Sequence, residues 1–203
     1  MKNSLHFIFW LLFISGIFFL LCCNKKEQTN TGILTEEEKS DLLQLREEEK
    51  LARDVYLYTY EKYGLSISVN ISNSEQTHMD KVLQIMVVYG LADPASNETG
   101  VFNNDELQNL YDGLINEVNV SLINALIVGA TIEELDIKDI ELFLQRTIKE
   151  DISSMYESLI CGSRNHLRTY YSQIVTDGGT YNPVYISQTE FDFIINSENE
   201  NCN

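Results

Sequence analysis

The chain has 203 residues and is strongly acidic, with 31 Asp and Glu against 14 Lys and Arg and a formal net charge of −17. Such a surface repels the phosphates of nucleic acids and the headgroups of anionic lipids, so we expect neither as a partner. Of its 4 cysteines, only Cys161 and Cys202 lie beyond residue 23, and two distant cysteines are no disulfide framework. These two can pair with each other in an oxidising compartment, but they cannot form a four-cysteine metal site.

Residues 1–22 have the pattern of a lipoprotein signal peptide. Lys2 provides a positive charge, and residues 7–21 are apolar apart from Ser15 and Gly16. This apolar run is short for a membrane span and is typical of a signal-peptide core. The alternative is a signal anchor that stays uncleaved.

The signal segment ends in a sequence that resembles the lipobox of bacterial lipoproteins. Cys23 has Leu20 three residues before it and the small Cys22 directly before it, whereas Cys22 follows the bulkier Leu21. We therefore predict that Cys23 carries lipid and begins the mature protein. A lipidated cysteine would anchor the chain to a membrane, and so we expect a place in the bacterial cell envelope.

The mature chain reads as a polar tether, a helical domain and a tail. We assign residues 23–34 to the tether, 35–176 to the domain and 177–203 to a tail that packs on it. Thr35 and Glu38 form a capping-box pattern, and Gly64 ends the first helix. A short stretch, 65–69, precedes the second helix. The predicted helices are 35–63, 70–89, a short 105–117, 121–145 with a bend near 136, and 148–175.

No segment alternates apolar and polar residues as a half-buried strand does, so the domain is predicted to be all-α. The four long segments indicate a four-helix bundle, with an extra short helix between the second and third. The tail contains Pro183 and a capping-box pattern from Ser187 to Glu190.

Histidines and acids occupy matching positions in the two halves of this bundle. His78 and His166 lie in the second and fourth long helices, and Glu49 and Glu133 lie in the helices before them. Glu75 precedes His78 by one helical turn and shares its face. Glu from two helices and Glu-x-x-His from the other two is the pattern of di-metal bundles.

Each of these polar residues interrupts an apolar helical stripe, as Glu49 does between Leu45 and Ala52. Burying several carboxylates without compensating cations would cost many kcal/mol. Two transition-metal ions would supply the charge. Carboxylate and imidazole ligands suit iron, which we favour, as well as manganese and zinc.

Residues 49–56 resemble the E-x-x-A-R-x-x-Y first helix of rubrerythrins. The runs 75–79, 129–139 and 162–168 resemble the DUF2202 family, over about residues 45–195. This resemblance implies a ferritin-like bundle, but the family has no agreed activity to transfer.

Two departures separate the chain from di-iron enzymes. Ser163 stands where the fourth helix of those enzymes carries Glu, and Asp136, one turn after Glu133, is our hypothesis for its replacement. The chain also lacks the four-cysteine iron domain through which rubrerythrins pass electrons, so the electron donor is unknown.

Each assignment has a structural alternative. Glu75 could end a capping box that begins at Ser72, and the two histidines could be hydrogen-bonded core residues. Glu134 competes with Glu133 as the ligand. We interpret Tyr56 as a core aromatic, and the remaining acids of the run, Glu47 and Glu48, as a solvated face.

Two functions are compatible with these patterns. The first is a di-metal oxidoreductase or metal-handling protein that acts on peroxide, oxygen or the metal itself. The second is an envelope interaction or structural module whose metal site is structural or lost. Whether the protein is an enzyme, and whether it forms a homo-oligomer, is left open by the sequence.

Overall fold

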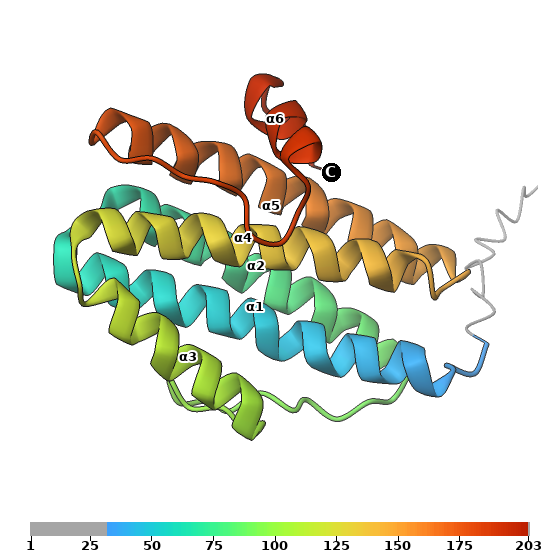
Figure 1. Cartoon of the computed structure of the whole chain (residues 1–203). Helices are drawn as coiled ribbons and strands as arrows, with labels where there is room; N and C mark the ends of the chain where they lie inside the picture. Colours follow the sequence, from blue (N-terminus) through green and yellow to red (C-terminus); the bar gives the residue numbers. More distant parts are fainter. Residues whose placement is uncertain (1–31, 203) are drawn as a thin grey trace, which may run out of the picture. The chain divides into compact units, whose positions relative to one another are not determined.

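The computed structural model describes residues 32–202, which form helices and no strands (Figure 1). The expectation of an all-α fold is confirmed. The helices in this part of the chain are α1 (Glu36–Tyr63), α2 (Ser66–Val88), α3 (Asp105–Val118), α4 (Leu122–Leu144), α5 (Glu150–Thr176) and α6 (Gln188–Asn196).

The four long helices form a bundle. α1 packs along α2, and α4 packs along α5. Contacts of α1 with α4 and of α2 with α5 join these two pairs into the bundle. Figure 1 shows α2 and α4 running in the same direction. The connection between them, which includes α3, therefore returns the chain to the end of the bundle where α2 begins. This is a bundle with one long crossover connection.

The ends of α1 follow from local chemistry. The Thr35 hydroxyl accepts a hydrogen bond from the Glu38 amide, and the Glu38 carboxylate accepts one from the Thr35 amide, so both halves of the capping box are present. Gly64 ends the helix with a φ of 68°, a left-handed conformation that favours glycine.

The start of α2 differs from the expectation. Because the single left-handed residue Gly64 reverses the chain, α2 begins at Ser66 and includes most of the predicted connecting stretch 65–69. α4 likewise runs as one helix from Leu122 to Leu144, where the sequence suggested a bend near Asp136.

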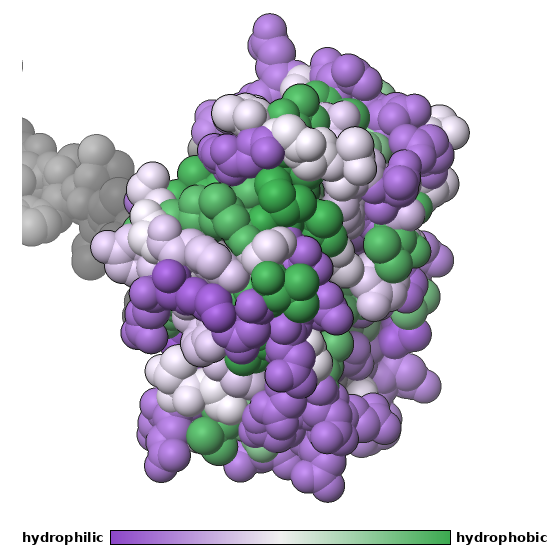
Figure 2. Space-filling view, turned by 60° about the vertical axis from the view of Figure 1, so that its left-hand side comes forward, coloured by the Kyte–Doolittle hydropathy of each residue, from purple (hydrophilic) through white to green (hydrophobic). Residues whose placement is uncertain are grey.

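Apolar side chains from all four long helices fill the space between them, including Leu42, Leu45, Val82, Met86, Leu126, Ile137, Ile140, Ile152 and Leu159. The face shown in Figure 2 is largely hydrophilic, with one large apolar area and several smaller ones. Within residues 32–202, no helix combines the length and the apolar character that crossing a bilayer requires.

The C-terminal tail packs on α4 and α5. The Glu134 carboxylate accepts hydrogen bonds from the backbone amides of Val184 and Tyr185, at 2.7 and 2.8 Å. The Arg168 guanidinium donates to the Ile194 carbonyl at 2.8 Å. These contacts hold the chain against the bundle before α6 and within its last turn.

The last residues of the tail are tied to α5 by covalent and ionic bonds. Cys202 forms a disulfide with Cys161. Glu200 accepts hydrogen bonds from Arg164 and Arg168, and these charges lower the pKa of Glu200 to about 2. The tail thus covers the part of α5 that carries His166.

Candidate metal centre

Five ionisable side chains meet in the middle of the bundle, contributed by all four long helices. Glu49 comes from α1, Glu75 and His78 from α2, Glu133 from α4 and His166 from α5. The three carboxylates have no exposed surface, and the histidines are 4% and 9% exposed. The structure therefore brings together five of the six residues that the sequence pattern proposed as ligands.

Glu75 joins two groups of possible ligands. One group is Glu49, Glu75 and His78, and the other is Glu75, Glu133 and His166. Glu75 Oε2 lies 2.8 Å from Nδ1 of His78, and Glu75 Oε1 lies 2.8 Å from Nδ1 of His166. The two oxygens of one carboxylate thus face two different imidazoles.

The outer carboxylates complete each group. Glu49 Oε2 lies 3.2 Å from Nδ1 of His78, and Glu133 Oε2 lies 3.4 Å from Nδ1 of His166. The two imidazole rings are stacked at an angle of 27° with their centres 5.7 Å apart. Each histidine nitrogen therefore lies between two carboxylates.

Several of these close atoms are not hydrogen-bonded to each other. Both oxygens of Glu75, Oε2 of Glu133, Oε1 of Glu49 and Nδ1 of His166 are buried without a hydrogen-bond partner. Polar atoms in a protein core are almost always paired, because an unpaired one loses its hydration without replacement. The Glu75 oxygens and the histidine nitrogens lie 2.8 Å apart without hydrogen-bond geometry, so they present ligand atoms to a shared space. Such an arrangement suits a cation.

Charge interactions inside the site shift its pKa values. Burial disfavours a charged His78, but the carboxylates of Glu75 and Glu49 outweigh it and raise its pKa to about 10. The pKa of His166 is also raised against the effect of burial, by Glu75 and Glu133. Burial opposes ionisation of Glu75, yet both imidazoles hold its pKa well below the usual range. In the metal-free protein, protons on the histidines therefore balance the carboxylate charge.

Glu133 is oriented by an aromatic side chain. The Tyr56 hydroxyl donates a 2.6 Å hydrogen bond to Glu133 Oε1, which leaves Oε2 facing His166. The ring of Tyr170 lies 5.3 Å from that of Tyr56 and packs directly against Gly129. Tyr56 is thus a core aromatic, as expected, and also touches a candidate ligand.

The neighbouring acids of α4 have different environments. Glu134, the alternative ligand, faces away from the site, and its carboxylate accepts hydrogen bonds from backbone amides of the tail. Asp136 is 3% exposed and belongs to neither ligand group. Burial and the nearby charges of Glu49 and Glu133 raise its pKa. Ser163 donates its hydroxyl to the carbonyl of Leu159 on its own helix.

The interpretation of Glu47 and Glu48 as a solvated face is wrong, because they are only 6% and 7% exposed. α1 packs against α2, α3 and α4 at once, so it has little free surface at this level. Burial raises the pKa of Glu48 to about 7. A helix covered on three sides buries consecutive residues, which a single apolar stripe does not predict.

The capping alternative for Glu75 is also excluded. Ser72 lies inside α2, which begins at Ser66, so Glu75 is far from the first turn.

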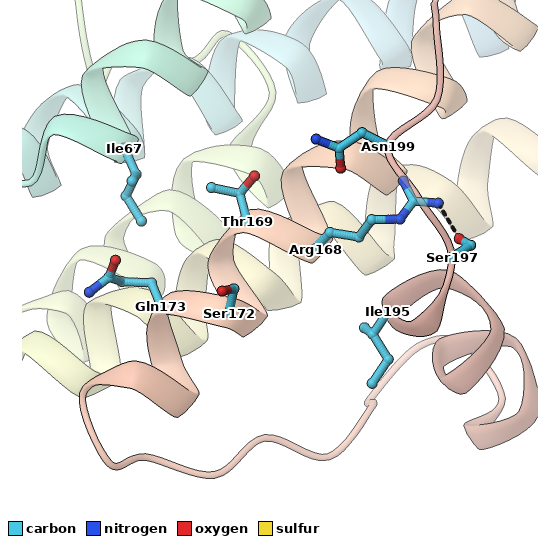
Figure 3. A pocket seen from close by; sticks show the side chains of 8 residues that line it. All are labelled: Ile67, Arg168, Thr169, Ser172, Gln173, Ile195, Ser197 and Asn199. Atoms are coloured by element: carbon cyan, nitrogen blue, oxygen red, sulfur yellow. Dashed lines mark hydrogen bonds between the residues drawn. The ribbon is translucent and has the colours of Figure 1, made fainter.

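A separate cavity of about 450 Å³ lies between α2, α5 and the tail (Figure 3). Ile67 points across it toward the α5 side chains, and Arg168 turns toward Ser197, to which it donates at 2.7 Å. None of its lining residues is a candidate ligand: Ile67, Arg168, Thr169, Ser172, Gln173, Ile195, Ser197 and Asn199.

Comparison with known sequences identifies the family. A family model described as "Uncharacterized protein domain (DUF2202)" matches residues 38–198. The chain belongs to the DUF2202 family.

A curated protein is similar to this DUF2202 chain over most of its length. This is the uncharacterized protein MJ0754 of Methanocaldococcus jannaschii, 48% identical over 168 residues, which are 82% of this chain and 91% of that protein. A crystal structure of hypothetical protein MJ0754 from Methanococcus jannaschii matches with a TM-score of 0.81 at 47% identity. That match covers 83% of this chain and 97% of the other.

The electrostatics of this DUF2202 site lead to a first prediction. Glu75→Gln removes the carboxylate that contributes most to the raised pKa of both histidines. The imidazolium forms of His78 and His166 should then lose their protons at lower pH than in the wild type. NMR titration of the imidazole C–H signals in metal-free protein measures this change. Asp80→Asn alters an exposed acid of the same helix and should leave both titrations unchanged. Unchanged histidine titrations in Glu75→Gln would contradict the geometry described above.

Proposed function

We propose that this protein has a ferritin-like bundle that binds two transition-metal ions between its four long helices, with Glu75 shared between them. The observation that supports this most strongly is that the two Glu75 oxygens each lie 2.8 Å from a different histidine nitrogen and make no hydrogen bond. Glu49 and His78 would complete one position, and Glu133 and His166 the other. The residues fit because every ligand atom is an oxygen or imidazole nitrogen, which suits iron, manganese or zinc.

Cations would also resolve the electrostatic problem of the site. Three carboxylates are fully buried there, and in the metal-free protein only protonation of the neighbouring groups balances them. Metal ions require the deprotonated ligands and displace these protons, so metal affinity should rise with pH. We include Asp136 in the proposal as a further carboxylate, because it is buried one turn from Glu133 and is affected by the charge of Glu49.

The site residues divide into ligands and supports. Tyr56 holds one oxygen of Glu133, so that the other points toward His166. Ser163 supplies no carboxylate and bonds to its own helix, so α5 contributes only His166 to the proposed site. With iron bound, such a centre supplies redox chemistry toward peroxide or oxygen. We therefore favour an oxidoreductase or metal-handling role.

One observation favours a second role. α5 presents Ser163 one turn before His166, where the sequence pattern of di-metal bundles places a carboxylate. A site with fewer ligands is compatible with a bundle whose metal ions are structural, in an envelope interaction module.

We also propose that the protein is attached to the cell envelope through lipid on Cys23. This residue lies outside the described part of the chain, and the proposal is supported by the lipobox-like sequence before it. Mass spectrometry of protein from its native membranes should show a diacylated Cys23 as the first residue. A chain that retains Met1 would overturn the assignment.

The metal proposal predicts stoichiometry and stability. Wild-type protein supplied with iron, manganese and zinc should contain about two transition-metal ions per chain. His78→Ala and His166→Ala should each lower that content, because each removes a ligand from one position. Adding metal to metal-free protein should raise the melting temperature by mass action. Elemental analysis and thermal unfolding measure these effects.

The matched control is an acid on α1 that is exposed and lies outside the site. Glu61 is exposed on α1, so Glu61→Ala should keep the wild-type metal content and thermal shift. If wild-type protein binds no metal and metals leave its melting temperature unchanged, the proposed metal centre is wrong.

A further inference from the structure

Gly162 of α5 lies against the imidazole of His78. A Cβ atom added at Gly162 would lie 2.6 Å from Nε2 and 2.7 Å from Cε1 of that ring, and 4.0 Å from Cε1 of His166. Carbon atoms in contact are normally about 3.5–4.0 Å apart. Any residue other than glycine would therefore occupy space that the His78 ring now fills.

The ring of His78 is also held at Nδ1, the nitrogen on the far side of Cε1 from Nε2. This atom lies 2.8 Å from Glu75 and 3.2 Å from Glu49. The residue is 4% exposed, so it is enclosed by protein on nearly all sides. The ring is thus held between the backbone of α5 and two carboxylates, and its position depends on how closely α5 approaches.

We propose that Gly162 is a positioning residue for the metal centre: its missing side chain lets α5 approach closely enough to hold His78 Nδ1 against Glu49 and Glu75. This inference rests on the proposed function and extends it to a residue that binds no metal. Glycine is less favourable than alanine inside a helix, so helix stability does not explain its presence.

The geometry makes the effect unequal between the two metal positions. A Cβ atom added at Gly162 would overlap the ring of His78, whereas it would lie at an ordinary contact distance from His166. Displacing His78 would separate one ligand from Glu49 and Glu75 and leave Glu133 and His166 in place. Gly162 therefore acts on the position formed by Glu49, Glu75 and His78.

The test is Gly162→Ala in the full-length protein. It should lower metal content from about two ions to about one, and weaken the lost ion's binding about 10- to 100-fold, the range for residues that support metal ligands. Elemental analysis and Co²⁺ titration followed by visible absorption measure this. In metal-free protein, the imidazole NMR signals of His78 should shift more than those of His166, which reports ring displacement without metal.

Gly113→Ala is the matched control, because Gly113 is an exposed glycine in α3 with open space around its Cβ position. It should retain two ions and unchanged histidine signals. In a His78→Ala background, Gly162→Ala should cause no further loss of metal, since the two changes act through one ring. Circular dichroism should show that both alanine variants remain helical.

The outcomes separate the two proposals. Wild-type protein with about two ions and Gly162→Ala with the same two at unchanged affinity would overturn the role of Gly162 alone. Further loss in the His78→Ala background would assign the effect to helix packing and also overturn it. Metal-free wild-type protein would overturn the proposed function and, with it, this role of Gly162.

Discussion

The Glu75 carboxylate lies between two imidazoles in the centre of the bundle, and the arrangement of the surrounding helices depends on this interaction. Its two oxygens contact His78 from the same helix and His166 from α5. Because the carboxylate is fully buried, the positive charges near it must be close and well oriented to offset the lost hydration. Protons on the histidines provide that charge in the metal-free protein, and the proposed ions would take their place.

The rest of the bundle holds this charged centre in place. Tyr56 bonds one oxygen of Glu133, and Gly162 lets α5 approach His78 closely. Farther out, the Glu134 carboxylate accepts hydrogen bonds from backbone amides of the tail. The disulfide from Cys161, the residue before Gly162, fixes the end of the tail. Groups next to the site in sequence thus stabilise the elements around it. A site built on rigid helices retains its geometry better than one built on loops.

Much of the site could be predicted because helices repeat every 3.6 residues. Glu75 and His78 were placed on one face by their spacing, and the matching positions of Glu49, Glu133 and His166 in the two halves brought the five together. The helices themselves were predicted from apolar periodicity and caps. α2 began earlier than expected because Gly64 alone reverses the chain.

The remaining features depend on contacts between distant segments. Glu47 and Glu48 are buried because three helices cover α1, which no local pattern in α1 indicates. The sequence did not decide between Glu133 and Glu134 as the ligand. The structure decides it, because Glu134 bonds to the tail 50 residues later in the chain. The sequence left the Cys161–Cys202 pairing open, and the contact of Gly162 with His78 requires the packing of α5 on α2.

Binding of two metal ions that share the Glu75 carboxylate is the main feature of the proposed function. X-ray diffraction from crystals grown with Mn²⁺ or Fe²⁺, with data collected at the metal's absorption edge, tests it most directly. We expect two anomalous peaks per chain, one between Glu49, Glu75 and His78 and the other between Glu75, Glu133 and His166. Electron density for all five side chains with no anomalous peak among them, or peaks only at the protein surface, would contradict it.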